Sequence, residues 1–267
     1  MNAQQFEDIL YERRNAAAII TINRPQRYNA FRAQTVEELI KAFKMAWADH
    51  GVQAVILTGA GEKAFCSGGD VKQRAETGDY GPSESGLFEI GLLHKTIRDI
   101  PKPVIAAVNG IAIGGGHVLQ VLCDLTIASS TARFGQSGPR VGSFDAGFGS
   151  AYLARIVGEK RAREIWYLCR QYDAEKAMSW GLVNEIVEPD KLIDEAMAWA
   201  DEIAEKSPTA IRFLKQSFNA DTDHQAGLSN MAMSALDLYA VSDEGMEGAN
   251  AFAEKRAPDF ASKVSHH

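Results

Sequence analysis

The sequence predicts an α/β fold in which helices cover the faces of a buried sheet. Short runs rich in β-branched and other apolar residues recur near Gly, Pro, Asn or Asp, at residues 17–22, 54–58, 104–108, 125–128 and 183–187. Between them lie apolar residues at helical spacing, most clearly Val36, Leu39, Ile40, Phe43 and Trp47. Because strand and helix alternate along the chain, we expect the helices to bury the sheet.

The helix around residue 40 carries its own start signal. Thr35 followed by Glu38 is the pattern of a capping box, in which side chains at the start of a helix accept hydrogen bonds from free backbone amides. The sequence therefore predicts that the helix begins at Thr35.

The last third of the chain is predicted to be mainly helical. Apolar residues recur at helical spacing over residues 192–203, and Ser207 followed by Pro208 opens another helix. We expect residues 1–200 to form the core and residues 201–265 to form a helical region of the same domain, packed on the core or on another subunit. Residues 77–86, TGDYGPSESG, are rich in Gly, Ser and Pro and are the best candidate for a mobile loop or lid.

Composition excludes several classes of protein. The chain has 267 residues, with 35 acidic against 28 basic side chains and a formal net charge of -7, so nucleic acid is not an expected partner. No stretch approaches the roughly 18 uninterrupted apolar residues that cross a bilayer, so no membrane partner is expected. Residues 1–10 lack the pattern of a signal or transit peptide. His266 and His267 are interpreted as the remnant of a tag.

Cysteine and histidine usage indicates a reduced, cytoplasmic protein without a metal site. Cys66, Cys123 and Cys169 are far apart and form no CxxC pair. The histidines lack metal-ligand spacing. His117 is expected to pack in the interior or to form a pocket wall, and Trp166 is expected to pack in the core.

Two glycine-rich segments are candidates for binding an oxygen atom through backbone amides. They are CSGGD at residues 66–70 and GIAIGGGH at residues 110–117, and each follows a predicted strand. The second precedes a helical run, whose first amides are free and lie at the positive end of the helix dipole. Neither segment matches the phosphate-binding or dinucleotide-binding glycine motifs. The alternative is that the glycines only permit tight turns or close packing.

Ser143 and Asp145 are the candidate reactive side chains. They lie in a predicted loop before a helix, in GQSGPRVGSFDAGFG at residues 135–149. A carboxylate beside an enclosed apolar pocket can have a raised pKa and act as a general base, while a neighbouring hydroxyl orients water or substrate. Both residues could instead cap the helix. Ser143 lacks the G-x-S-x-G frame of a nucleophile elbow.

Five segments together resemble the crotonase, or enoyl-CoA hydratase/isomerase, superfamily. They are INRPQRYNAF (22–31), AFCSGGD (64–70), PKPVIAAVNGIAIGGG (101–116), CDLTIA (123–128) and FGQSGPRVG (134–142), in matching order and spacing over nearly the whole chain. The resemblance implies a ClpP-like spiral of ββα units whose helical C-terminal region serves as a trimerisation or lid region. It also implies a trimer or a dimer of trimers and an acyl-CoA thioester substrate.

The resemblance assigns roles to the glycine-rich segments. The amides of Gly69 and Gly115 match the oxyanion hole, in which preorganised donors stabilise a thioester enolate. Contacts with CoA or substrate are implied for Ser67, Gly68, Asp70, Val71, Lys72, Ile111, Gly114, Ser137 and Lys255, the lysines as partners of phosphate groups. Coenzyme A enters as part of the substrate, and no covalently bound cofactor is implied.

The resemblance also narrows the reaction. The two glutamates with which hydratases add water match Val118 and Gly138, which disfavours enoyl-CoA hydration. Residues 135–149, with REIWYLCRQYDAEKAMSWGLVN at residues 163–184, are instead similar to the branch of 2-ketocyclohexanecarboxyl-CoA hydrolase and 1,4-dihydroxy-2-naphthoyl-CoA synthase. Both enzymes break or make a ring carbon–carbon bond beta to a thioester.

Within that branch, Ser143, Asp145 and Tyr80 match catalytic residues. Asp145 would activate water or move a proton, while Ser143 and Tyr80 would orient the ring ketone. A pocket that holds bicarbonate in many synthases matches Gln136, Ser137, Gly138 and Trp166. In a hydrolase, water or a substrate carboxylate could occupy that pocket instead.

Two features place hydrolytic ring opening first and ring closure by a synthase second. Ala240 stands where the synthase has a C-terminal tyrosine, although Tyr239 is adjacent. Residues 94–103 and 217–239 are more similar to the hydrolase. An enoyl-CoA hydratase/isomerase and a non-catalytic acyl-CoA-binding protein come after these two, and the last would require Ser143 and Asp145 to be caps only.

Overall fold

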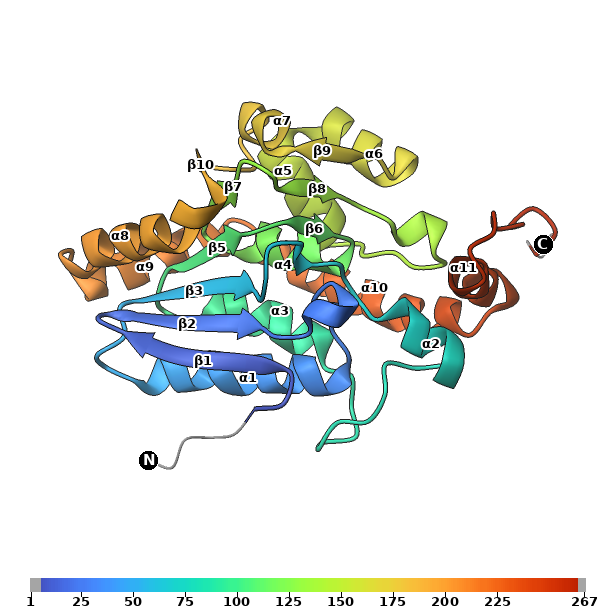
Figure 1. Cartoon of the computed structure of the whole chain (residues 1–267), viewed down its shortest axis with the longest axis horizontal. Coiled ribbons are helices and arrows are strands. Elements are labelled where there is room, and N and C mark those ends of the chain that lie inside the picture. Colours follow the sequence, from blue (N-terminus) through green and yellow to red (C-terminus); the bar gives the residue numbers. More distant parts are fainter. Residues whose placement is uncertain (1–5, 264–267) are drawn as a thin grey trace.

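Two sheets form the centre of the protein (Figure 1). In the computed structural model, which describes residues 6–263, the larger sheet has the strand order β1-β2-β3-β5-β7-β10 and the smaller one β4-β6-β8-β9. The larger sheet contains β1 (Ile9–Arg14), β2 (Ala17–Ile22), β3 (Ala54–Gly59), β5 (Val104–Val108), β7 (Leu125–Ser129) and β10 (Glu185–Val187). The smaller sheet contains β4 (Ala64–Cys66), β6 (Ile111–Ile113), β8 (Arg133–Gly135) and β9 (Gln171–Asp173). Only β1 and β9 run antiparallel to their neighbours.

Successive ββα units connect the two sheets. The first strand of each unit joins the larger sheet and the second joins the smaller sheet, as in β3 and β4 before α2 (Val71–Thr77) and β5 and β6 before α4 (Gly115–Leu122). The second strand of each unit ends in a glycine turn that leads directly into the helix. The predicted α/β fold is confirmed, and its glycine turns lie at neighbouring strand ends.

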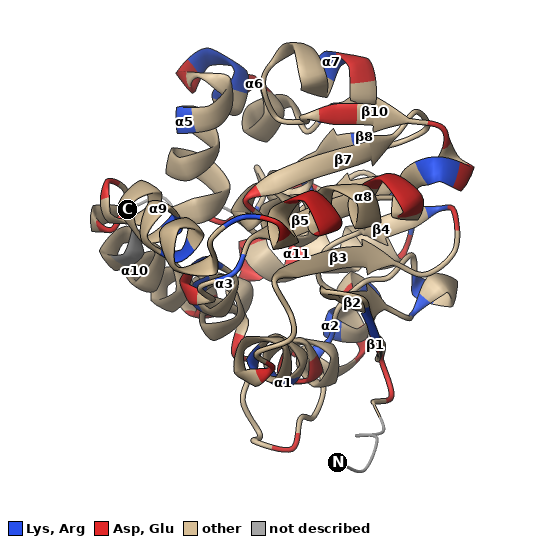
Figure 2. Cartoon of the chain, turned by 90° about the vertical axis from the view of Figure 1, so that its left-hand side faces the viewer, with Lys and Arg blue, Asp and Glu red and all other residues tan. Residues whose placement is uncertain are grey.

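Helices cover both faces of the larger sheet. Alternate strand residues such as Ile20 and Leu57 face a large core that contains α1 (Ala33–Ala48) and α3 (Ile90–Asp99). Residues one position away, such as Ile19 and Ile56, face α8 (Leu192–Ala204), which lies across the strands (Figure 2). Side chains of successive strand residues point to opposite faces, so this burial on both sides explains the nearly continuous apolar strands.

The remaining helices lie beyond the sheets. They are α5 (Leu153–Val157), α6 (Glu159–Leu168), α7 (Ala174–Ser179), α9 (Pro208–Ala220), α10 (His224–Ala240) and α11 (Asp243–Ala253), with a π-helical turn at Phe148–Tyr152 and 3-10 turns at Pro25–Arg27, Gly138–Arg140 and Pro189–Lys191. The helical C-terminal third and the start of α9 after Ser207 are as predicted. None of the helices within residues 6–263 is long and apolar enough to span a bilayer. His266 and His267 lie outside the described residues.

The predicted start of α1 is wrong by two residues. The helix begins at Ala33, and the amide of Arg32 donates to Thr35 Oγ1 at 3.1 Å, so Thr35 lies in the first turn. The Glu38 carboxylate accepts from the backbone amides of residues 7 and 8, both at 2.8 Å. The pattern was misleading because Glu38 binds the segment before β1 instead of the start of its own helix.

The strand expected at residues 183–187 is shorter than predicted. It begins at Glu185, and Asn184 presents its side-chain oxygen to the amide of Thr126 at 2.8 Å. A side chain therefore takes the place of one backbone acceptor at the start of the strand.

Candidate active site

Most of the predicted site residues line one cavity. The cavity lies where the loops after β4, β6 and β8 meet α3 and α10, and it encloses about 700 Å³ including its open mouth. The predicted residues on its wall are Ser67, Gly68, Gly69, Val71, Tyr80, Gly114, Gly115, Gln136, Ser137, Gly138, Ser143, Asp145 and Trp166.

Four residues expected to contact CoA or substrate are not on this wall. The Asp70 carboxylate is buried and caps α2, and the amide of Ile111 donates to Lys63 at the start of β6. Lys72 and Lys255 are exposed to solvent. The structure therefore places both lysines outside the cavity, where only a part of the ligand that extends beyond the mouth could reach them.

The amides of Gly69 and Gly115 are free to bind a ligand. Gly69 forms a parallel bridge with Phe31, in which Phe31 bonds to the residues on either side of Gly69. The amide of Gly69 therefore faces away from Phe31. Gly115 is the first residue of α4, where a helix leaves its amides unpaired. Among residues 6–263, neither amide has a protein acceptor.

Close backbone contact between the two loops requires glycine. At Gly68, φ is +92°, and a Cβ there would lie 3.0 Å from the amide nitrogen of Gly115. Gly114 has φ +57° and ψ -127°, a region open essentially to glycine alone. The tight turns that these glycines permit bring the two free amides to one cavity.

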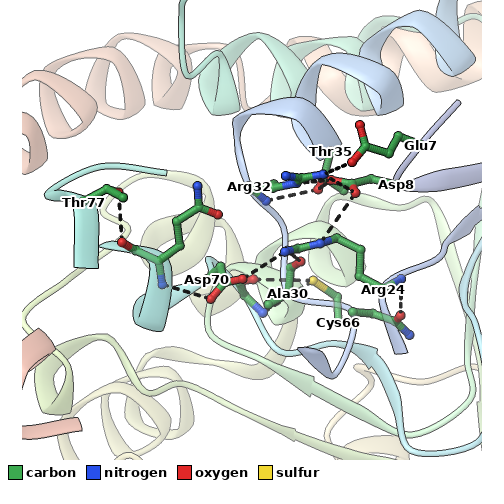
Figure 3. Close-up of polar contacts among 12 residues, drawn as sticks. Glu7, Asp8, Arg24, Ala30, Arg32, Thr35, Cys66, Asp70 and Thr77 are labelled. Carbon is green, nitrogen blue, oxygen red and sulfur yellow. Dashed lines mark hydrogen bonds and ion pairs between the residues drawn. The ribbon is translucent and has the colours of Figure 1, made fainter. Parts of the chain in front are cut away.

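A buried ionic network lies behind the Gly69 loop (Figure 3). The guanidinium of Arg24 is 3.0 Å from Asp70 Oδ2 and 3.7 Å from Asp8 Oδ1, and it donates to the carbonyl of Ala30. Asp8 also pairs with Arg32 at 2.7 Å. Burial acts to raise the pKa of Asp8, but the hydrogen bonds from Arg32 and Thr35 and the nearby guanidinium charges outweigh it and lower that pKa. The network holds the Asp70 side chain in place, and Asp70 directly follows Gly69, whose amide is a candidate oxyanion donor.

Asp145 lies half-buried on the cavity wall, with one carboxylate oxygen paired and the other free within the described chain. Its Oδ1 accepts a hydrogen bond from the amide of Gly149 at 2.9 Å, as a cap would. Oδ2 has no protein partner in the described chain. Burial raises the pKa of Asp145 to about 6, against the opposing effect of the Gly149 bond. A carboxylate with this pKa is suited to accept a proton near neutral pH.

Tyr80 lies against the Gly69 loop. A Cβ at Gly69 would meet the Tyr80 ring at 2.5 Å and its hydroxyl oxygen at 2.9 Å. The ring stacks on Phe88 with centroids 4.4 Å apart, and the backbone carbonyl of Tyr80 accepts a hydrogen bond from the amide of Ala33. The phenol is therefore held beside one of the free amides, in the segment between α2 and α3 predicted to be a lid.

Gly138, Trp166 and Gln136 form the wall next to Ser143. A Cβ at Gly138 would lie 2.6 Å from the Ser143 carbonyl and 3.0 Å from the Trp166 ring. Trp166 is buried and donates from Nε1 to the Gly149 carbonyl at 2.6 Å. Trp166 therefore packs in the core, as predicted, and also lines the cavity.

His117 is packed beneath this wall and does not reach the cavity. Gln136 Nε2 lies 3.0 Å from His117 Nδ1, which accepts the bond in the neutral tautomer. Burial lowers the pKa of His117 to about 4, so the ring is uncharged at neutral pH. This agrees with the packed role expected from the sequence.

Sequence reasoning missed nine residues of the wall, namely Phe31, Arg74, Phe88, Ile90, His94, Val141, Phe144, Met233 and Leu236. Arg74 donates from one nitrogen to the carbonyls of Val141, Gly142 and Gly245, and thereby joins α2 to the loop before Ser143 and to α11. The spacing of Ile90 and His94, one helical turn apart, signalled a shared helix face. Nothing in the sequence indicated that this face borders the cavity.

Two free backbone amides and a carboxylate of raised pKa lie in one cavity, an arrangement suited to binding an oxyanion and accepting a proton. The chain belongs to the enoyl-CoA hydratase/isomerase family, whose pattern matches residues 12–263. It is thus an acyl-CoA-processing enzyme of the crotonase superfamily.

Solved structures agree with this membership. An enoyl-CoA hydratase from Mycobacterium avium subsp. paratuberculosis K-10 has 26% identity and a TM-score of 0.85, covering 96% of this chain and 99% of that one. A carnitinyl-CoA hydratase from Mycobacterium avium has 31% identity and a TM-score of 0.84, covering 96% and 98%. An enoyl-CoA hydratase from Bacillus anthracis has 33% identity and a TM-score of 0.73, covering 95% and 99%.

Proposed function

We propose that this protein hydrolyses the ring of a cyclic β-ketoacyl-CoA of the 2-ketocyclohexanecarboxyl-CoA type. The observation that carries the proposal is the Asp145 carboxylate, whose pKa is about 6, in the same cavity as Ser143, Tyr80 and the free amides of Gly69 and Gly115. A base, two hydroxyls and an oxyanion hole are the groups that such a ring opening needs.

The reaction follows from these groups. Asp145 accepts a proton from water as the water oxygen adds to the ring ketone, whose oxygen is held by the hydroxyls of Ser143 and Tyr80. The bond between the former ketone carbon and the α-carbon then breaks, and its electron pair forms a thioester enolate bound by the amides of Gly69 and Gly115. Asp145 then gives the proton that it took from water to the α-carbon, which restores the Asp145 carboxylate. The product is an open-chain thioester with a new carboxylic acid, which ionises in water. The amides act mainly on the enolate, where the negative charge on the thioester oxygen is largest.

Enoyl-CoA hydration is disfavoured by the two positions that match the glutamates of hydratases. Val118 is fully buried inside α4, and a side chain at Gly138 would collide with Ser143 and Trp166. Val118 therefore lies away from the cavity wall, and the wall next to Ser143 leaves no space for a second carboxylate at position 138. Asp145 takes the acid–base role alone.

Ring closure by a dihydroxynaphthoyl-CoA synthase is the alternative, since the same groups can serve the reverse type of reaction. The Tyr239 hydroxyl, however, donates to Glu244 at 3.3 Å, and its ring packs on Phe144 with centroids 5.6 Å apart. Ala240 carries no hydroxyl. The C-terminal phenol expected of a synthase thus has no free equivalent here, which supports hydrolysis.

The pocket implied for bicarbonate has few free donors. Gln136 Nε2 is paired with His117, and Trp166 Nε1 is paired with Gly149. The second N–H of the Gln136 amide and the hydroxyl of Ser137 remain as polar groups of this set on the cavity wall. Two such groups suit a water molecule or a single substrate oxygen better than a bicarbonate ion, so we propose that water occupies this position in the hydrolase.

We also propose that the protein is a homo-trimer or a dimer of trimers joined through its C-terminal helices. Exposed apolar residues gather on α9 and α10, with Phe213 63%, Phe218 75%, Met231 63% and Leu238 76% exposed. Phe218→Asp is expected to lower the mass measured by light scattering, whereas Tyr167→Asp on α6, 70% exposed, leaves it unchanged. A monomeric wild-type protein at working concentration would exclude this assembly.

Mass spectrometry of reaction products tests the activity. The protein is incubated separately with 2-ketocyclohexanecarboxyl-CoA and with o-succinylbenzoyl-CoA. We expect the first to gain one water and give pimeloyl-CoA, and the second to remain unchanged. Loss of water from the second would establish ring closure instead. If neither substrate gives a product, the ring-opening proposal is wrong, and the family membership is unaffected.

A further inference from the structure

His94 is a buried polar residue on the cavity wall to which neither the resemblance nor the proposed mechanism assigns a role. It lies on α3 with 1% exposure, one turn after Ile90, and borders the cavity together with Met233 and Leu236 of α10. Within the described chain, neither ring nitrogen has a hydrogen-bond partner. The edge of the ring faces Phe148, with centroids 6.3 Å apart. Ile90, Met233 and Leu236 beside it are apolar, so the imidazole of His94 is the polar group of this part of the wall.

An unpaired buried imidazole is unfavourable unless something binds it. Buried polar groups in folded proteins are nearly always hydrogen-bonded, and the exceptions concentrate at functional sites. An apolar side chain of similar size would fill the same space without an unpaired donor and acceptor. The position of His94 on a cavity wall makes a ligand in that cavity the natural partner.

The ring is in its neutral form. Burial lowers the pKa of His94 to about 4, and Arg98, one turn later, binds to Asn219 and Thr222 on the far side of the wall. A neutral imidazole offers one N–H donor and one acceptor nitrogen. A carboxylate could use only the donor, whereas a hydroxyl group can bind at either nitrogen, by accepting from the N–H or by donating to the other nitrogen.

We propose that His94 determines specificity by binding a hydroxyl group on the ring of the acyl substrate. This inference rests on the proposed function, which assigns the thioester oxygen to Gly69 and Gly115 and the ketone oxygen to Ser143 and Tyr80. The hydroxyl is therefore a third oxygen function, and the substrate class becomes hydroxylated cyclic β-ketoacyl-CoA thioesters.

Binding of unreactive analogues tests the inference. Cyclohexanecarboxyl-CoA and its 2-, 3- and 4-hydroxy derivatives lack the ring ketone and cannot be cleaved, so calorimetry measures binding alone. Wild-type protein is expected to bind at least one hydroxylated isomer about 10-fold more tightly than the plain ring. In His94→Leu this preference is expected to disappear, mainly because the plain ring binds better.

Two further variants separate recognition from packing. His94→Gln keeps a donor and an acceptor and is expected to retain part of the preference, whereas Ile90→Leu on the same helix face alters shape alone and retains all of it. In wild-type protein, the ¹⁵N resonances of the His94 ring, identified by their loss in His94→Gln, are expected to move on addition of the preferred isomer and not of the plain ring. This second measurement does not depend on the folding of His94→Leu.

Equal binding of the plain ring and its 3- and 4-hydroxy derivatives by the wild-type protein would overturn the inference and leave His94 as a site for water. A preference for either of these two isomers that survives in His94→Leu would also overturn it. The 2-hydroxy derivative, whose oxygen takes the position of the ketone oxygen, is the control for binding to Ser143 and Tyr80. If the product assay fails while the His94-dependent preference is observed, ring opening is wrong and the hydroxyl-binding role stands. The opposite pair of results would leave ring opening intact and remove the role of His94.

Discussion

The two sides of the cavity are built in different ways. On one side, Gly69 and Gly115 contribute backbone amides at the ends of short strands, supported from behind by the Arg24 network. On the other side, Asp145 and Ser143 contribute side chains from a loop, and His94 lies on a helix. We refer to these as the amide wall and the side-chain wall.

The two walls depend on the sequence in different ways. Every residue except proline supplies a backbone amide, so the amide wall depends on the path of the backbone, which the glycines permit. The side-chain wall depends on residue identity, because replacement of Asp145 or Ser143 removes a reactive group while the fold is kept. In the mechanism we propose, enolate stabilisation therefore rests on the fold, and the reaction that uses the enolate rests on the side-chain wall.

Loss of the Asp145 carboxylate is the strongest test of the side-chain wall. Asp145→Asn is expected to lower kcat for ring opening by about 10³-fold, while binding of an unreactive acyl-CoA stays within a factor of a few. In wild-type protein, kcat is expected to rise as the pH increases through about 6 and then level off, because only ionised Asp145 accepts a proton. Steady-state kinetics from pH 5 to 8 measure both effects.

Asp173→Asn is the matched control. Asp173 caps α7 through the amide of Lys176 at 2.9 Å, just as Asp145 bonds to Gly149, but it lies outside the cavity. Its replacement is expected to leave kcat unchanged. Undiminished turnover in Asp145→Asn would contradict the assignment of the base and, with it, the division between the two walls.

Removal of Arg24 tests the support behind the amide wall. Arg24→Met leaves the buried carboxylate of Asp70 without its cation and is expected to lower the free energy of unfolding by about 3 kcal/mol. Arg14→Met breaks an exposed pair with Glu12 and is expected to cost less than about 1 kcal/mol. Urea denaturation compares the two variants, and equal losses would show that the buried network gives no special support.

The sequence allowed the fold to be predicted where one pattern dominates. Strands β2, β3, β5, β7 and β10 were found as short β-rich runs beside turn residues, because strands buried on both faces are nearly continuously apolar. The helices that begin near residues 192 and 208 were found from helical spacing and a start signal. The three-residue strands of the smaller sheet were not found, since such short runs carry no period. The start of α1 was misplaced because Glu38 has a long-range partner that local patterns do not reveal.

The candidate site was predictable to a similar extent. Resemblance pointed to residues of the amide wall and to Ser143, Asp145 and Tyr80, which the structure brings to one cavity. His94 and Leu236 were missed because α3 and α10 reach the cavity through tertiary packing. Their distance along the chain from the glycine loops gave no indication of that contact. The catalytic roles themselves remain predictions for the experiments above.

The placement of Asp145 sets folding and catalysis against each other. Its pKa rises from 3.8 to about 6 on folding, so the folded protein favours the protonated carboxyl. The free energy of unfolding is therefore highest below pH 4 and falls as the pH rises through 6. At neutral pH it is lower by an amount on the order of 2 kcal/mol. Selection for thermal stability alone at pH 7 would favour an uncharged side chain at position 145. In this chain a carboxylate that lowers stability at that pH is retained, as expected where activity requires it.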